Sequence, residues 1–260
     1  MKKTILSAKQ GELLETLIAK YGQVVTADQI HAEATGTWGY QQTKNRISQL
    51  VKHGWLIRIK RGLYAISDLS SRGFLSVSPY AVAHLLVQGS YVSFEAALAY
   101  HGMFDQFTDQ FVSVSLTQFQ TVQLNSIQYR FIKAKKELYF GWQEAMIDNM
   151  AAHIATAEKA LVDMVHFRKS KYAVDLMIEK LQDYQDSLDV DRLYEYLGQA
   201  SLLTVKVFGL VFDLLNRNSD RLYNQVIDKK STHRMSSEDQ TFNAKWRLYY
   251  DEYFDKYQIN

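Results

Sequence analysis

The sequence predicts an α+β protein, with an N-terminal winged helix-turn-helix followed by a mixed α/β domain whose C-terminal part is mainly helical. Three observations support this fold class. Capped segments with a helical apolar period fill the first fifty residues, two short alternating runs follow them, and helical periods dominate from Thr156 onward. A chain of 260 residues with 47% hydrophobic content can bury enough surface for two domains.

Capping patterns mark the first two helices. Ser7 is followed three residues later by Gln10, the spacing of a capping box, and Gly22 suits the end of that helix. Thr26 and Gln29 repeat the signal for a short second helix to about Ala34. A third helix is expected from Tyr40 to His53, where Ile47, Leu50 and Val51 form one apolar face.

Two alternating runs, Trp55–Lys60 and Leu63–Ile66, are joined at Arg61-Gly62 and predict a β-hairpin. Three helices and a basic hairpin together indicate a winged helix. The polar stretch from Ser67 to Gly73 has no periodicity and is the best candidate linker. We therefore expect one domain over residues 1–71 and a second over residues 72–260, with the boundary near Ser71.

The second domain is expected to be mixed. Ser78-Pro79 predicts a helix start, because Ser can cap and Pro suits the first helical position. Alternation predicts strands at Phe111–Leu116, Ile127–Ile132 and, more briefly, Tyr139–Trp142. Further helices are expected from Ser93 to about His101, from Thr156, and over Leu176–Tyr184, Val190–Leu197, Leu202–Leu215 and Asn243–Tyr257.

Charge is unevenly distributed although the net charge is only +2. From Trp38 to Arg72 there are seven basic residues against one acid, Asp68, a net of +6. Between Asp175 and Glu195, acids outnumber bases by seven to two. The first segment suits a polyanion and the second would repel one.

The third helix and the hairpin carry side chains suited to duplex DNA. Asn and Gln can bond adenine in the major groove, and Arg and Lys can bond guanine or phosphate. The candidate DNA-binding residues are Gln41, Gln42, Lys44, Asn45 and Arg46 on the helix, and Arg58, Lys60 and Arg61 on the wing. The alternative interpretation is a merely solvated helix face. Trp38, Tyr40, Trp55 and Tyr64 are interpreted as packing residues.

Several function classes lose support. The chain has no cysteine, no secretory leader pattern and no apolar run long enough to span a membrane, so we expect a cytoplasmic protein. Phosphate-loop, dinucleotide-binding, zinc-protease and serine-hydrolase motifs are missing, and the histidines lack metal-ligand spacing. The sequence therefore predicts no enzyme, no cofactor and no metal, with His101 and His166 as structural residues.

Three segments resemble a known family. Leu56–Tyr64 contains Arg-Gly-Leu-Tyr, Val92–Met103 contains a Ser-Phe-Glu-Ala-Ala-Leu helix ending in His-Gly-Met, and Ala157–Asp163 reads Ala-Glu-Lys-Ala-Leu-Val-Asp. In this order they resemble the AbiEi family of abortive-infection antitoxins over most of residues 1–170. The departures are Met103, where leucine is common, and a charge-rich tail that does not align.

The resemblance implies a type IV toxin–antitoxin system that acts in antiviral defence. Such an antitoxin represses its own operon by binding operator repeats. Its second domain antagonises a nucleotidyltransferase-like toxin without requiring a stable complex. The resemblance also marks Glu158, Lys159 and Asp163 as a candidate antitoxin-domain motif, although a first-turn acid and a Lys–Asp pair four residues apart equally suit a structural role.

Two alternatives stay open. The chain could be a winged-helix regulator whose second domain senses a small ligand or modifies a partner protein. RNA binding is the third reading, although the sequence indicates no aromatic stacking platform for it.

Overall fold

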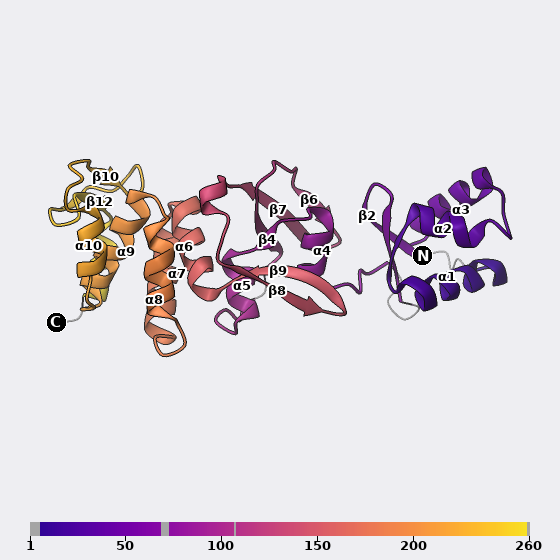
Figure 1. Ribbon diagram of the computed structural model, residues 1–260, viewed down its shortest axis with the longest axis horizontal. Coiled ribbons are helices and arrows are strands. Elements are labelled where there is room, and N and C mark those ends of the chain that lie inside the picture. The colour runs from indigo at the N-terminus through magenta and orange to yellow at the C-terminus, as the bar shows by residue number, and fades with distance from the viewer. Residues whose placement is uncertain (1–5, 69–72, 107, 259–260) are drawn as a thin grey trace. The chain divides into compact units, whose positions relative to one another are not determined.

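The computed structural model describes residues 6–68, 73–106 and 108–258 and confirms the α+β class (Figure 1). The chain divides into two compact units. One contains Met1–Gln88 with Val122–Tyr129 and Met146–Ala152, and the other contains Gly89–Thr121, Arg130–Ala145 and His153–Asn260. The expected domain boundary near Ser71 lies among residues 69–72, outside the described residues.

The two predicted capping boxes form. Helix α1 (Ala8–Tyr21) begins where the Ser7 side chain accepts from the Gln10 amide, and the Gln10 side chain accepts from the Ser7 amide. Thr26 and Gln29 make the same reciprocal pair at the start of α2 (Ala27–Ala34). Strand β1 (Val24–Thr26), which the sequence analysis did not predict, lies between these helices.

A winged helix is completed by α3 (Tyr40–Lys52), β2 (Leu56–Lys60) and β3 (Leu63–Ile66). The strands pair antiparallel in the order β1-β3-β2, and Gly62 takes a φ of 75° in the tight turn between β2 and β3. Buried apolar side chains from all three helices and the strands form one core, including Leu17, Val25 and Ile30. Trp55 is buried and Tyr64 packs against this core, as expected.

Helix α4 (Pro79–Leu86) follows, with the Ser78 side chain accepting from the Tyr80 amide and Pro79 at the first helical position, as predicted. It packs against β2 in the same unit. The Lys60 ammonium donates to the Leu86 carbonyl at 3.4 Å. One of the three proposed wing cations is thereby directed toward a protein carbonyl.

A six-stranded sheet has the order β6-β7-β5-β4-β9-β8. Its strands are β4 (Tyr91–Val92), β5 (Gln110–Ser115), β6 (Val122–Leu124), β7 (Ile127–Lys133), β8 (Trp142–Ile147) and β9 (Met150–Ala155). Val92 pairs antiparallel with Ser113 of β5 and parallel with Ile154 of β9. The strands expected near Phe111–Leu116 and Ile127–Ile132 are confirmed.

The strand expected at Tyr139–Trp142 is wrong. A short 3-10 helix, η1 (Lys136–Leu138), precedes this segment, Gly141 turns the chain with a φ of 74°, and β8 only begins at Trp142. The β8–β9 hairpin was missed because its turn is Asp148-Asn149, with φ values of 53° and 60°. Asp and Asn tolerate this left-handed region, but the pair is a weaker hairpin signal than Asn-Gly or Asp-Gly.

Helices build most of the remaining chain (Figure 1). They are α5 (Phe94–Tyr100), α6 (Ala157–Arg168), α7 (Lys171–Asp183), α8 (Val190–Gly198), α9 (Leu202–Leu214) and α10 (Asp220–Val226). The sequence analysis did not predict α10. Helix α6 contacts α5, α7, α8 and α9 and is buried on every side from Ala157 to Val165. It is the central helix of this unit.

The helix expected over Asn243–Tyr257 is wrong. A small sheet takes its place, with β10 (His233–Arg234), β12 (Leu248–Tyr250) and β11 (Thr241–Asn243) in that order, followed by the 3-10 helix η2 (Glu252–Tyr257). Trp246, Leu248 and Tyr250 are buried alternately, a strand period. The Trp246 ring lies so close to Gly209 of α9 that a Cβ there would come within 2.1 Å of it.

Candidate DNA-binding surface

The polar face of α3 is fully exposed. Gln41, Gln42, Lys44, Asn45 and Arg46 are all exposed, whereas Thr43, Ile47 and Leu50 are buried on the opposite side. Spacings of three and four residues place Gln41, Gln42 and Asn45 together on one face. The structure thus brings the predicted helix residues together at the start of one helix with their polar ends in solvent.

Backbone groups at the start of α3 add to this surface. Gly39, the N-cap residue before α3, has no side chain to accept from the first amides, so no side-chain hydrogen bond caps this end. Free amides at a helix N-terminus favour an anion such as a DNA phosphate. Farther along, the Arg46 guanidinium donates to the Gln49 side chain at 3.0 Å, which holds it along the helix.

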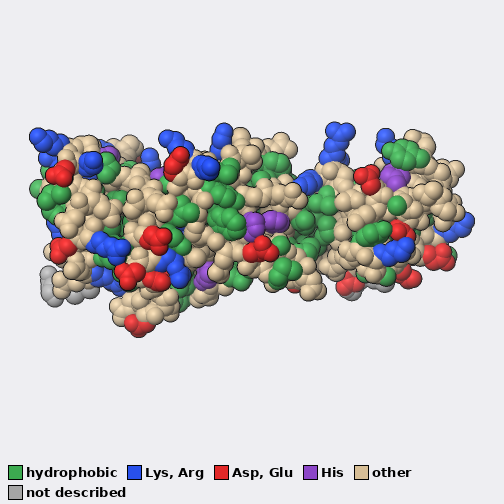
Figure 2. Space-filling model, viewed as in Figure 1, with side chains coloured by type: hydrophobic (Ala, Val, Ile, Leu, Met, Phe, Trp, Pro, Cys, Tyr) green, Lys and Arg blue, Asp and Glu red, His purple; other side chains and the backbone are tan. Residues whose placement is uncertain are grey.

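The wing residues differ in their freedom. Arg58 and Arg61 are exposed, while Lys60 is half-buried because of its hydrogen bond to Leu86. A register shift between Arg58 and Lys60 interrupts the regular pairing of β2 with β3. Lys and Arg side chains project where the tip of this hairpin lies (Figure 2). Two of the three predicted wing cations are therefore fully available to phosphates.

Tyr40 departs from its expected packing role. It is 73% exposed and stacks on His31 with ring centroids 4.4 Å apart, so it covers the start of α3 rather than filling the core. Trp38, by contrast, packs against the core as expected. The exposure of this aromatic side chain was not evident from the sequence, because large aromatic residues are buried on average.

The nearest acid before α3 in the sequence, Glu33, is already paired. Glu33 of α2 is bound by Lys20 at 2.7 Å and by the Tyr21 hydroxyl at 2.9 Å. These hydrogen bonds, that from Lys20 above all, lower the pKa of Glu33, so it is ionised and paired at neutral pH. No acid occurs between Tyr40 and Ser67, which leaves α3 and the hairpin purely basic.

Residues 12–67, from α1 to the end of the hairpin, match the family model described as "Transcriptional regulator, AbiEi antitoxin". This N-terminal part is therefore similar to the AbiEi antitoxin regulator family. The match covers every candidate residue of α3 and the wing. No curated protein sequence is significantly similar to this chain.

The fold of nearly the whole chain resembles the crystal structure of the RV2827C protein from Mycobacterium tuberculosis. The TM-score is 0.65, over 94% of this chain and 92% of that one, with 13% sequence identity. At this identity the likeness shows a shared fold alone. The fold likeness therefore extends beyond the segment that matches the family model.

The candidate AbiEi motif on α6 is buried. Lys159 and Asp163 are each 1% exposed and form an ion pair one helical turn apart. The hydroxyls of Tyr91 and Ser93 donate to the other Asp163 oxygen at 3.0 and 2.9 Å, and the Lys159 ammonium lies 4.5 Å from the centre of the Phe140 ring. Burial raises the pKa of Asp163, while Lys159 opposes that shift.

Glu158 has different partners. It is 3% exposed, and its Oε1 accepts from the Asp189 amide at 2.8 Å. Its Oε2 pairs with the Arg192 guanidinium at 3.5 Å without a hydrogen bond. The three motif residues thus tie α6 to β4, to the residue after it and to the start of α8. None of them is accessible to a partner.

The two histidines expected to be structural have protein partners. His101 Nε2 lies 2.8 Å from the Ala155 carbonyl, and His166 Nδ1 lies 3.1 Å from the Thr204 hydroxyl. Among the described residues no group of His, Asp and Glu is arranged to hold a metal ion. Over the same residues, no helix combines the length and apolar character needed to cross a membrane.

Proposed function

We propose that this protein is a cytoplasmic transcriptional autorepressor and the antitoxin of a type IV toxin–antitoxin system in abortive phage infection. Its winged helix binds operator repeats in its own promoter. Its second domain, residues 72–260, antagonises a nucleotidyltransferase-like toxin without requiring a stable complex. The proposal assigns the chain no catalytic activity.

The exposed polar face of α3 carries the DNA-binding part of this proposal. In the major groove, Gln41, Gln42 and Asn45 can each bond adenine through N6 and N7, and Lys44 and Arg46 can bond guanine. Arg58 and Arg61 of the wing reach phosphates, with Lys60 contributing less because its ammonium already has an acceptor. The helix selects sequence and the wing adds affinity.

The antitoxin part rests on the family match together with the three-segment resemblance. Because Glu158, Lys159 and Asp163 are buried, we propose that they maintain the second domain's fold and that toxin antagonism uses other, exposed residues. This division explains how a charged motif can characterise an antitoxin domain without touching the toxin.

The test of DNA binding is fluorescence anisotropy with a duplex that carries the chain's own promoter. Gln42→Ala and Asn45→Ala should weaken binding to the operator and relax base preference on a randomised library. Gln118→Ala, an exposed glutamine outside the winged helix, is the matched control and should bind as the unaltered chain does. Unchanged selectivity in both α3 variants would refute the assignment of α3 as the reading helix.

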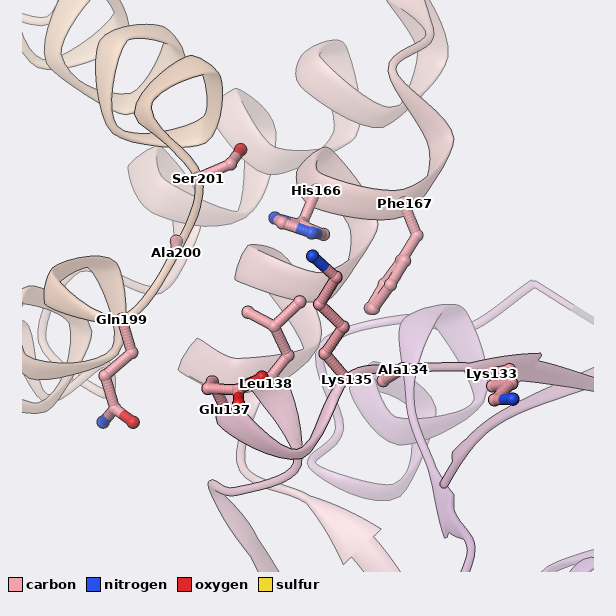
Figure 3. A pocket seen from close by; sticks show the side chains of 10 residues that line it. All are labelled: Lys133, Ala134, Lys135, Glu137, Leu138, His166, Phe167, Gln199, Ala200 and Ser201. Carbon is pink, nitrogen blue, oxygen red and sulfur yellow. The ribbon is translucent and has the colours of Figure 1, made fainter. Parts of the chain in front are cut away.

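A ligand-sensing second domain is the alternative function, and one cavity favours it. This cavity has a volume of about 680 Å³ and is lined by the end of β7, η1, α6 and the connection from α8 to α9. The Lys135 side chain extends toward the His166 ring inside it (Figure 3). Burial, together with Lys159 and Lys169, lowers the pKa of His166, so its ring is neutral at pH 7.

Genomic context separates the two functions. A neighbouring nucleotidyltransferase gene favours the antitoxin, whereas a metabolic operon favours ligand sensing. A biochemical test is Lys135→Ala, which should leave toxin rescue and operator binding unchanged if the antitoxin function is correct. A loss of ligand-dependent operator release in that variant would support the sensor instead.

A further inference from the structure

A small basic cavity lies between α9, α10 and the β11–β12 turn, outside every site considered above. Its volume is about 210 Å³. Four cationic side chains line it, together with two aromatic ones and no Asp or Glu: Lys206, Lys229, Lys245, Arg247, Tyr223 and Trp246. Positive groups that share a cavity of this size repel each other, and a bound anion would relieve that repulsion.

Lys206 is the most unusual of these residues. It lies on α9 and is 1% exposed. Its ammonium donates to the Ser231 carbonyl at 2.5 Å and lies 3.2 Å from Nδ1 of His233. Burial and Lys206 lower the pKa of His233, which favours the neutral ring beside the ammonium.

No described ion pair includes Lys206. An ammonium has three N–H donors, and the described residues place two polar partners within hydrogen-bond distance of it, the Ser231 carbonyl and His233 Nδ1. Burial, and next the charge of Arg247, lower the pKa of Lys206. A buried cation beside another cation is costly, and a bound anion would remove that cost.

The other three cationic side chains of the cavity can contact the same anion. Lys245 pairs with Asp213 at 2.8 Å, so its charge is partly neutralised. Lys229 and Arg247 are exposed, and neither belongs to a described ion pair, while Arg247 takes a left-handed φ of 48° at the turn before β12. Arg offers a planar fork to phosphate oxygens and Lys a compact charge, a combination that suits phosphate.

We propose that this cavity binds the phosphate group of a small phosphorylated molecule. Lys206 provides the buried contact, Arg247 and Lys229 provide contacts at the mouth, and the Tyr223 ring offers a flat wall for whatever the phosphate carries. A volume of about 210 Å³ is below the roughly 300–1,000 Å³ typical of drug-sized ligands. The ligand is therefore a phosphate or a small phosphomonoester, and the cavity shares no lining residue with α3 or the wing.

The experiment measures the melting temperature of the full chain at constant ionic strength with phosphate or chloride. Phosphate should raise the melting temperature, because a ligand that binds only the folded state stabilises it. Calorimetry with inorganic phosphate, glycerol 3-phosphate and glycerol then identifies the source. Equal affinity for the two phosphates indicates that the phosphate group alone is bound, and tighter binding of glycerol 3-phosphate indicates a small phosphomonoester. Glycerol binding as tightly as glycerol 3-phosphate would overturn the proposal.

Adjacent lysines give a matched pair of variants. Lys229→Gln should weaken phosphate binding at least tenfold, whereas Lys230→Gln, also exposed but outside the cavity lining, should not. Lys206→Met should abolish the phosphate response and melt no lower than the unaltered chain in chloride. Equal losses in both lysine variants, or no effect of phosphate beyond that of chloride, would overturn the proposal even if Lys206→Met fails to fold.

Discussion

Helices α3 and α6 both carry charged and polar residues in their first two turns, yet they place them oppositely. On α3 these side chains avoid the apolar face and are exposed, whereas on α6 Glu158, Lys159 and Asp163 are buried with their apolar neighbours. A helix with one apolar face presents its polar residues to solvent, and a helix buried on all sides pairs them internally. Substitutions in the buried motif of α6 should therefore reduce stability, whereas substitutions on the exposed face of α3 should reduce DNA binding.

The largest expected effect is on stability, at α6. Asp163→Ala leaves the Lys159 ammonium buried without its counter-charge and removes the acceptor of Tyr91 and Ser93. Breaking a buried pair in this way costs about 3–5 kcal/mol. Urea unfolding should show that loss, while Asp191→Ala, in an exposed ion pair, should change little. Equal stability of the two variants would contradict the structural role of the buried α6 motif.

Substitutions on α3 should give the opposite result. Asn45→Ala should cost about 1–3 kcal/mol of discrimination between operator and mismatched duplexes if Asn45 bonds a base with both groups. Its free energy of unfolding should stay within about 0.5 kcal/mol of the unaltered chain, because the side chain is exposed. Paired anisotropy and urea titrations test this, and a destabilised protein with unchanged discrimination would contradict it.

Variants of the wing should differ in how strongly salt weakens DNA binding. Arg58→Gln and Arg61→Gln should each reduce the slope of log K against log salt by about 0.9, as expected for one lost phosphate contact. Lys60→Gln should reduce it less, because Lys60 is half-buried and bonded to Leu86. Three identical slopes would show that the hydrogen bond to Leu86 does not restrain Lys60 in solution.

The smallest expected effect concerns pH. Burial lowers the pKa of His166 in the folded state below its ordinary 6.5, so the unfolded chain binds a proton first as the pH falls. Stability should be complete above pH 6.5 and decline below it. His166→Gln should flatten this decline by less than about 1 kcal/mol, since the ring is partly exposed and solvent screens it. Thermal unfolding at pH 5 and pH 7 measures this effect. The control is His53→Gln, because His53 is half-exposed and lies in the winged helix.

Local signals made the winged helix predictable. Ser7 with Gln10, and Thr26 with Gln29, determine helix starts within a few residues of chain, and Gly62 permits the hairpin turn that follows. The same local reasoning indicated which α3 side chains are exposed. It could not show that Lys60 bonds the carbonyl of Leu86, because that partner lies 26 residues away.

The C-terminal sheet depends on contacts that sequence periodicity does not reveal. Trp246 inserts against Gly209, 37 residues earlier, and this long-range packing outweighs the helical tendency of the Asn243–Tyr257 segment. Lys206 was also missed as a site residue. The one signal for it was a single charge within the apolar run from Leu202 to Phe212, and a buried cation there called for a partner that the sequence alone does not identify.

Separation of DNA reading from toxin antagonism is the central claim, and one double variant of the full chain tests it most directly. Gln42→Ala/Asn45→Ala is expressed from an independent promoter, together with the toxin gene that the proposed function requires and a reporter for the chain's own promoter. We expect the reporter to be derepressed while growth is rescued as fully as by the unaltered chain, because both substitutions are confined to the exposed face of α3. If growth rescue is lost along with repression, or if repression persists, the account is contradicted.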